Sequence, residues 1–136
     1  MSKEKVLKII ADAPTAIMAT VEGNNPRVRP MMIKKVWDKI FYVSTYADSN
    51  KIQQIEKNPN TEILWIDSQR QHVRIAGKAF ICQDVAKKNQ YFKENEDVMK
   101  MYFKGKDDPN YILLEVKPEK VLLMEAGSME YQEIAW

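Results

Sequence analysis

The sequence is poor in the residues that build the commonest metal and covalent sites. Its 136 residues include one cysteine, Cys82, and one histidine, His72. A lone cysteine excludes an internal disulfide framework and a cysteine-built zinc site, and a lone histidine excludes a multi-histidine metal centre. We therefore expect no bound metal. Because Cys82 lies in an apolar segment, we expect it to be an inert core residue.

An excess of charge of either sign is also missing. The 21 basic and 19 acidic residues give a formal net charge of +2 and are spread along the chain. This balance predicts no binding to nucleic acid or to an anionic membrane surface. Residues 1–14 lack an apolar run as long as a signal peptide or a membrane span. We expect a soluble, cytoplasmic protein in which any anion binding depends on a few local charges.

The length and the apolar pattern predict a single, mainly β domain over residues 1–136. Six or seven strands follow one another mostly in hairpin order, with connections too short for parallel crossovers. Hairpin-linked strands lose their exposed edges most simply by closing into a barrel, so we expect an antiparallel barrel with helices outside. The expected helices are 3–13, 49–58 and 84–102; the expected strands are 15–21, a strand containing Arg27 to Pro30, 40–45, 61–67, 72–82, 111–116 and 120–125.

Particular residues within these segments predict local features. Pro30 donates no ladder hydrogen bond, so its strand should be an edge or contain a bulge. Gly77, inside an apolar strand, predicts a bulge or a sharp bend. We expect residues 36–39 to form a turn, Trp65 to lie in the core, and Val98 and Tyr102 to be buried. The terminal Trp136 docks either on its own subunit or on another.

The segment 24–51 indicates an anion site. Arg27 and Arg29 are two residues apart in a strand, so their side chains point to one face. A helix opening at Ser49 presents free N–H groups at Asn50 and Lys51, the Ser49 hydroxyl and the Lys51 ammonium, which together suit a phosphate. The arginines could instead form a solvated strand face, and Ser49 could be only a helix cap. Capping and phosphate binding are compatible roles for this serine.

Four motifs occur in register with one another: PRVRPM (26–31), IFYVST (40–45), SNKIQQIEKNP (49–59) and VRIAGKAF (73–80). Their order and spacing resemble the pyridoxamine 5'-phosphate oxidase-like family of FMN-binding split barrels, most closely its general stress protein and nitroimidazole-resistance branches. The resemblance covers most of the chain. It implies a six- to seven-stranded antiparallel split β-barrel with flanking helices, and a homodimer that binds two FMN molecules at its interface.

The resemblance also implies roles for particular residues. Arg29 matches the arginine that meets the phosphate and ribityl part of FMN, and the helix start at Ser49, Asn50 and Lys51 matches the phosphate site. The remaining matches place Pro30, Met31 and Met32 under the isoalloxazine ring, Val43, Ser44 and Thr45 along the same pocket, and His72 where a glutamine reaches the partner's flavin in some relatives. The resemblance also implies a match between Lys34 and a further phosphate-side lysine.

The expected activity is that of an FMN-dependent oxidoreductase which passes electrons or hydride from a reduced nicotinamide to a small acceptor. The flavin supplies the redox chemistry, and no side chain is clearly placed as an acid or base. The chain ends in EYQEIAW and lacks the arginine and histidine pattern of pyridoxal phosphate recognition, so the vitamin-processing activity is not expected. The alternatives are a non-catalytic flavin-binding or stress-response protein, and a split barrel that binds haem or a deazaflavin.

Overall fold

Eight strands and four helices form the structure, a computed structural model that describes residues 2–136. The strands are β1 (Ala16–Glu22), β2 (Asn25–Met31), β3 (Lys35–Trp37), β4 (Ile40–Tyr46), β5 (Asn60–Ile66), β6 (His72–Ile81), β7 (Tyr111–Met124) and β8 (Gln132–Ile134). The helices are α1 (Ser2–Asp12), α2 (Asn50–Lys57), α3 (Val85–Glu94) and α4 (Glu96–Tyr102). In the described residues, none of these helices has the length and apolar character needed to cross a membrane.

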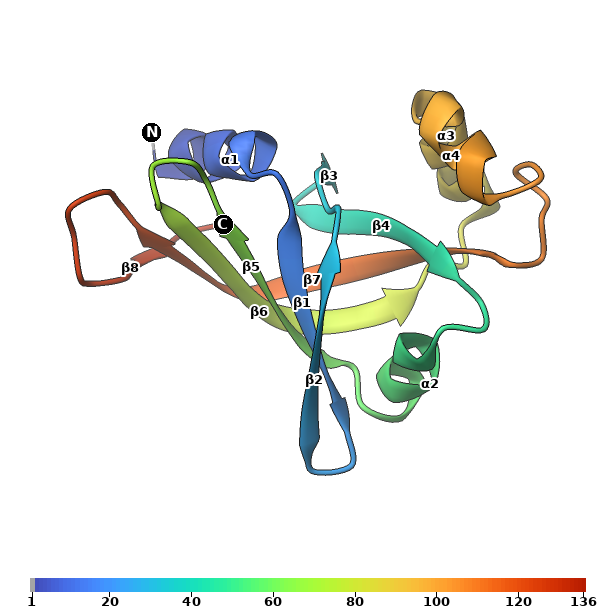
Figure 1. The fold of residues 1–136 in the computed structure, drawn as a ribbon, viewed down its shortest axis with the longest axis horizontal. Coiled ribbons are helices and arrows are strands. Elements are labelled where there is room, and N and C mark those ends of the chain that lie inside the picture. The colour runs from blue at the N-terminus through green and yellow to red at the C-terminus, as the bar shows by residue number, and fades with distance from the viewer. Residues whose placement is uncertain (1) are drawn as a thin grey trace.

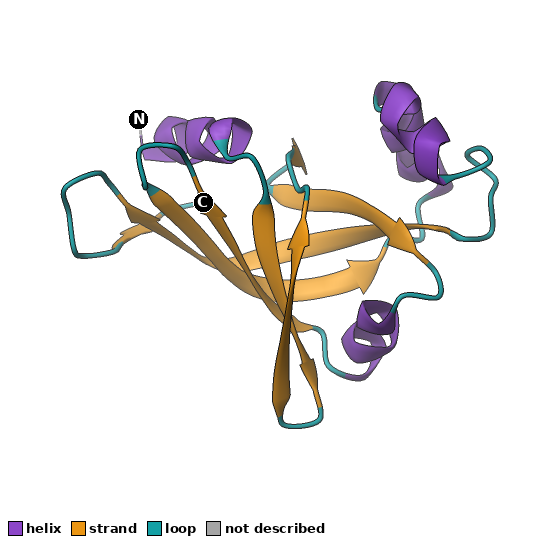
Figure 2. Ribbon diagram, in the orientation of Figure 1, coloured by secondary structure: helices purple, strands orange, loops and turns teal. Residues whose placement is uncertain are grey.

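All eight strands belong to one antiparallel sheet. Its order is β2-β1-β5-β6-β7-β4-β3, with β8 paired to β7. β2 and β3 end this path, and no pairing between described residues joins them, so the curled sheet stays open along one seam (Figure 1). The helices lie at the margins of the strands (Figure 2). The fold is therefore the mainly β split barrel with flanking helices that the sequence predicts, and β2 is the edge strand that Pro30 predicts.

The strand count is eight rather than six or seven because two short strands escape sequence-based detection. Residues 36–39, expected to form a turn, include part of β3; the turn itself is Asp38 and Lys39, with φ of 48° and 70°. Positive φ at both central residues matches the twist of a two-residue hairpin, so β3 can pair with β4. β8 pairs with residues 121–123. Strands of three residues are too short to show an alternating pattern.

β7 is one continuous strand of 14 residues, whereas the sequence predicts two strands separated by residues 117–119. Pro118 lies within it, opposite Gly77 of β6, and the register shifts between Ala76 and Gly77. The bulge expected at Gly77 is thus confirmed. A Cβ on Gly77 would lie 2.1 Å from the Lys117 carbonyl oxygen, so only glycine permits this approach of the two backbones.

Aromatic side chains pack in the main core and attach the end of the chain to it. Trp65 is buried as expected, and its indole N–H donates to the Ile33 carbonyl at 2.8 Å. Trp136 docks on its own subunit, because its ring stacks on Phe41 with centroids 5.7 Å apart and its indole N–H donates to the Lys39 carbonyl at 2.9 Å. The last residue of the chain therefore belongs to the same core as β4 and β5.

A second apolar cluster lies where α3 and α4 meet the sheet. It contains Tyr42, Cys82, Tyr91, Phe92, Met99, Phe103, Tyr111 and Leu113. Burial raises the pKa of the Cys82 thiol, which agrees with its expected role as an inert core residue. The region expected as one helix breaks at Asn95, whose backbone N–H donates to the carbonyls of Tyr91 and Phe92. This break divides the region into two short helices, α3 and α4.

We predict that Gly77→Ala destabilises the protein by about 1–3 kcal/mol, the usual cost of forcing an extra group into a packed site. The new methyl group would meet the Lys117 carbonyl, which belongs to the backbone and cannot rotate away. Equilibrium urea denaturation measures the change. Gly105→Ala is the matched control, since a Cβ added there meets nothing within 4 Å. Equal unfolding midpoints for the two variants would contradict the close approach of β6 and β7.

Candidate functional site

The strand that carries Arg29 and the helix that opens at Ser49 meet at one cavity. Its volume is about 510 Å³. β2 contributes one wall and the first turn of α2 contributes the other, so side chains from two distant parts of the sequence face the same space. The residues that line the cavity are Glu22, Arg27, Val28, Arg29, Ser49, Asn50, Lys51 and Gln54.

Lys51 is a buried cation at the centre of this site, with only 9% of its surface exposed. Its ammonium donates to the Thr45 hydroxyl at 2.6 Å and to the Ser49 hydroxyl at 2.9 Å. Burial, and then the neighbouring positive charge of Arg29, lower the pKa of Lys51 below its usual value. A lysine in such surroundings gains from any anion that enters the cavity.

Arg29 is held by neutral oxygens in the same cavity. Its guanidinium donates to the Met18 carbonyl at 3.2 Å and to the Gln54 side-chain oxygen at 3.1 Å. Burial lowers the pKa of Arg29, but an arginine stays protonated at neutral pH. The guanidinium is therefore a fixed positive charge, oriented from both sides by protein acceptors.

Neither Arg29 nor Lys51 forms an ion pair with a carboxylate in residues 2–136. Arg27, by contrast, donates from Nε and Nη2 to the Glu22 carboxylate at 3.1 Å and 2.8 Å. Buried charges are normally paired, because removal from water is costly. Two neighbouring cations with only neutral partners thus indicate a site whose counter-ion comes from a ligand.

Ser49 caps α2 and also faces the cavity. Its hydroxyl accepts from the Lys51 backbone N–H at 3.3 Å as well as from the Lys51 ammonium. The backbone N–H of Ser49 donates to the Tyr46 carbonyl at 3.1 Å, which fixes the loop between β4 and the helix. The expectation of a free backbone N–H at Lys51 is therefore wrong, and the next one, at Ile52, donates to the Ser49 carbonyl at 3.1 Å. The serine that caps α2 therefore also lines the candidate anion site.

A second cavity of about 730 Å³ adjoins the first, and Lys51 lines both. It lies between the end of β2, the middle of β4 and the helices α3 and α4. All predicted site residues except His72 line one of the two cavities. The second cavity is lined by Pro30, Met31, Met32, Lys34, Lys35, Val43, Ser44, Thr45, Tyr46, Lys51, Tyr91, Asn95, Val98, Met99, Tyr102 and Phe103.

The outer wall of the second cavity is apolar and open. Val98 and Tyr102 of α4 are 53% and 57% exposed, so the expectation that they are buried is wrong. The reason is that α4 has only seven residues and buries only Met99 among them. Val98 and Tyr102 are left to face the cavity, together with Met32 from the end of β2. An exposed apolar surface of this kind is typical of a binding site.

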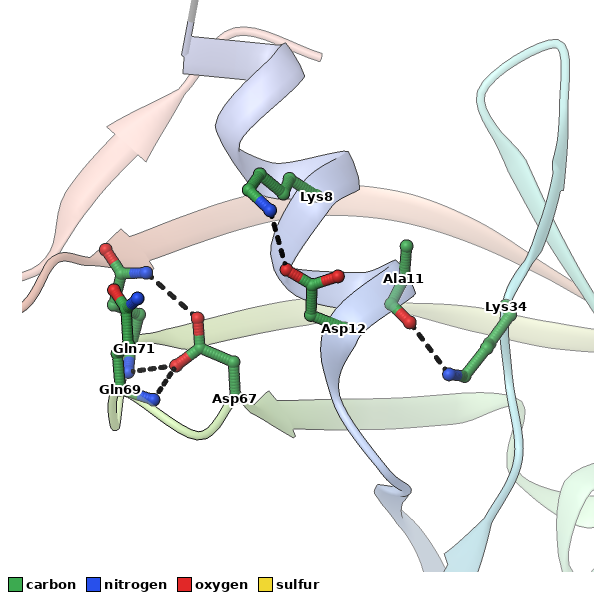
Figure 3. Close-up of polar contacts among 7 residues, drawn as sticks. All are labelled: Lys8, Ala11, Asp12, Lys34, Asp67, Gln69 and Gln71. Carbon is green, nitrogen blue, oxygen red and sulfur yellow. Dashed lines mark hydrogen bonds and ion pairs between the residues drawn. The ribbon is translucent and has the colours of Figure 1, made fainter.

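Two predicted residues lie elsewhere in the structure. His72 is at the far end of β6, with Nδ1 3.4 Å from the Tyr131 hydroxyl, and it lines neither cavity. Lys34 borders the second cavity, but its ammonium donates to the Ala11 carbonyl at 2.8 Å (Figure 3). There it satisfies a carbonyl of the last turn of α1, where a cation is favourable. Lys34 is therefore directed away from Arg29 and Lys51.

Sequence reasoning missed Gln54, which is buried in the first cavity. Its side-chain oxygen accepts from Arg29 and from the Thr20 hydroxyl, at 3.1 Å and 2.5 Å. Gln54 thus connects α2 to β1 and β2 and sets the position of the guanidinium. Its spacing offers a signal, because a residue three positions after Lys51 shares that helix face. The partner, Thr20, is a polar residue in an otherwise apolar strand.

Comparison with known proteins gives relatives over nearly the whole chain. General stress protein 26 of Bacillus subtilis (strain 168) is 34% identical over 130 residues, which cover 92% of this chain and 89% of that protein. The crystal structure of the General Stress Protein 26 from Bacillus anthracis str. Sterne is 28% identical, with a TM-score of 0.81 and 98% of both chains covered.

Less similar structures share the fold. A pyridoxamine 5'-phosphate oxidase-related, FMN-binding protein from Nostoc punctiforme has 19% identity and a TM-score of 0.70, covering 97% of this chain and 86% of that one. A heme binding protein from Mycobacterium smegmatis has 11% identity and a TM-score of 0.76, covering 98% of this chain and 57% of that one. The family model described as pyridoxamine 5'-phosphate oxidase like matches residues 1–131. The chain therefore belongs to the pyridoxamine 5'-phosphate oxidase-like family.

Proposed function

We propose that the protein binds FMN and is an oxidoreductase that passes electrons or hydride from a reduced nicotinamide to a small acceptor. One observation carries this proposal: Arg29 and Lys51, two half-buried to buried cations without a carboxylate partner in residues 2–136, face one cavity beside a helix start. The name of the Nostoc punctiforme neighbour, an FMN-binding protein with this fold, supports it.

The phosphate of FMN would occupy the first cavity. A dianion there receives hydrogen bonds from the Arg29 guanidinium, the Lys51 ammonium and the Ser49 hydroxyl, and it gains from the dipole of α2. It also removes the repulsion between the two cations, because each then has an anionic neighbour. The residues that the cavity already contains thus match a phosphate in charge and in hydrogen-bonding groups.

The isoalloxazine ring would occupy the second cavity. Pro30, Met31 and Met32 form one side of the cavity and Val43 to Thr45 form the other. Val98 and Tyr102 lie at its open side. Flexible thioether side chains and an aromatic ring suit a flat apolar ligand. Lys51 lines both cavities, so the ribityl chain that joins phosphate and ring would pass it. This arrangement fits one ligand that is anionic at one end and aromatic at the other.

The bound flavin supplies the redox chemistry, and the protein holds it and leaves one side accessible. The open side between Met32 and α4 would admit a nicotinamide or an acceptor. Haem is less well supported, because His72, the one histidine of the sequence, lies outside both cavities and offers no axial ligand there. The neighbour named as a heme binding protein shares only the fold with this chain.

We further infer a homodimer that forms through the outer face of the sheet. Paired residues of neighbouring strands share a face, so Ile17, Leu64, Arg74 and Leu122 form one row across β1, β5, β6 and β7. Ile17 is 36% exposed, and Leu64 and Leu122 are partly exposed. Three apolar side chains in this row, with Arg74 paired to Glu62 between them, suit a second copy of the chain, which would place the two FMN sites at the interface.

The visible spectrum of freshly purified protein tests the cofactor. We expect flavin absorbance that is bleached by a reduced nicotinamide and restored by an electron acceptor. Flavin absorbance that a reduced nicotinamide does not bleach would overturn the oxidoreductase proposal and favour a flavin-storing or stress-response protein. A Soret band, or a colourless protein that does not bind added FMN, would overturn the flavin proposal itself.

We predict that Arg29→Ala and Lys51→Ala each weaken FMN binding by about 1.5–3 kcal/mol, the usual contribution of a hydrogen bond to a charged group. Riboflavin lacks the phosphate, so its affinity should fall less. Quenching of flavin fluorescence measures both affinities. Arg27→Ala is the matched control, since Arg27 lines the same cavity but is paired with Glu22. Equal losses for FMN and riboflavin would show that these residues do not hold the phosphate.

Inorganic phosphate should raise the melting temperature of the wild-type protein, and Gln54→Glu should abolish that gain. The new carboxylate would take the place of a neutral acceptor beside Arg29 and would repel an incoming anion. The shift in melting temperature with phosphate, against chloride at equal ionic strength, is the measurement. Gln53→Glu adds the same charge to an exposed position of the same helix. A phosphate response that survives in Gln54→Glu but not in Gln53→Glu would contradict the assignment.

Ile17→Glu should shift the protein from dimer to monomer in sedimentation velocity runs, because a charge would be buried at the inferred interface. Leu7→Glu serves as its control: Leu7 has nearly the same exposure, 37%, but lies on α1. Dissociation of the dimer by Leu7→Glu but not by Ile17→Glu would contradict the inferred interface.

A further inference from the structure

We propose that Lys51 is also a modification site: when FMN is absent, small acyl phosphates acylate its side-chain amine. The anion-binding cavity of the proposed function would hold the phosphoryl group of such a reagent. The inference therefore rests on that cavity, but it does not require that the natural ligand be a flavin. Acylation would then act as a chemical block on cofactor binding.

The position of Lys51 separates it from the other lysines of the chain. It is the buried lysine of residues 2–136, and both cavities reach its side chain. Its ammonium contacts two hydroxyl groups, those of Thr45 and Ser49, and no carboxylate. Hydroxyls can accept from an ammonium or donate to a neutral amine, so either protonation state keeps its hydrogen bonds.

The surroundings of Lys51 raise the share of the neutral, nucleophilic amine above that of an ordinary lysine. Burial and the nearby charge of Arg29 lower its pKa, whereas a hydrogen bond to Asp12 raises the pKa of the exposed Lys8. Only an unprotonated amine attacks an acyl group, and lysines activated as nucleophiles are commonly desolvated or placed beside another cation. Lys51 has both features, and Lys8 has neither.

The same site would orient an acyl phosphate for attack. Its phosphoryl group would lie on Arg29 and the Ser49 hydroxyl, which is 2.9 Å from the Lys51 amine. The acyl carbon is one bridging oxygen from phosphorus, so it would come within reach of that amine. The acyl chain would extend into the second cavity, where Val43 and Met31 provide an apolar lining. Such positioning is an effective way to accelerate a two-reactant step.

The reaction balances without an oxidant or a reductant. The nitrogen lone pair attacks the acyl carbon, and the bond between that carbon and the bridging oxygen breaks. The bridging oxygen keeps the electron pair and leaves as inorganic phosphate, which takes the proton that the amine loses. An amide forms at Lys51, its positive charge is lost, and the phosphate site keeps only Arg29. Bound FMN would occupy the same space and protect the lysine.

The test treats FMN-free protein with acetyl phosphate and quantifies acetylation of each lysine by peptide mass spectrometry. Lys57, an exposed lysine of the same helix, is the internal reference. We expect Lys51 to react at least about tenfold faster, the factor that one charged hydrogen bond to the phosphoryl group would contribute. Acetic anhydride, which has no phosphoryl group, should show a smaller preference. Equal rates at Lys51 and Lys57 with acetyl phosphate would overturn the proposal.

Variants and protection experiments separate this inference from the proposed function. Arg29→Ala should reduce the preference for Lys51, while Arg27→Ala should leave it unchanged. Inorganic phosphate should protect Lys51 by competition. If phosphate protects Lys51 and saturating FMN does not, the acylation site stands and the flavin proposal fails. If FMN binds but Lys51 reacts no faster than Lys57, the flavin proposal stands and the acylation site fails.

Discussion

The placement of two positive charges, those of Arg29 and Lys51, beside one cavity is the constraint on which the candidate site depends. Each cation is removed from much of the solvent, and each donates to neutral oxygens, which belong to Met18, Thr45, Ser49 and Gln54. Two like charges close together are unfavourable by themselves, since a charge in a protein interior is usually paired with an opposite charge. The fold holds the two residues together because they belong to elements fixed by other contacts: Arg29 to β2, which is paired along its length with β1, and Lys51 to a helix anchored by apolar residues.

The barrel provides those other contacts. α2 buries Ile52 and Ile55 in the main core, so the first turn of the helix cannot move away from the sheet. β1 lies between β2 and β5, which makes it an internal strand and a rigid base for the edge strand that carries Arg29. The cost of bringing two cations together is thus met by apolar packing elsewhere, and the site is organised before any ligand arrives.

Local sequence patterns predict much of this architecture and part of the site. The strand pair that holds Trp65, the edge strand marked by Pro30 and the bend at Gly77 all follow from residue-level rules. β3 and β8 are too short to show a period, and the continuity of β7 through Pro118 depends on its partner strand. Gln54 escapes notice because its role arises from tertiary contacts with Thr20 and Arg29. The exposure of Val98 has the same kind of cause, since a helical pattern does not say how closely a short helix packs.

The break at Asn95 has a consequence for how specificity can change. The cations of the candidate anion site belong to β2 and α2, whereas the apolar outer wall of the second cavity belongs to α4, which buries only Met99. The charged residues and the apolar wall therefore lie on separate segments of the chain. Substitutions along α4 can change the shape of the second cavity for a different ligand and leave Arg29 and Lys51 in place. This division lets the apolar wall vary independently of the two cations.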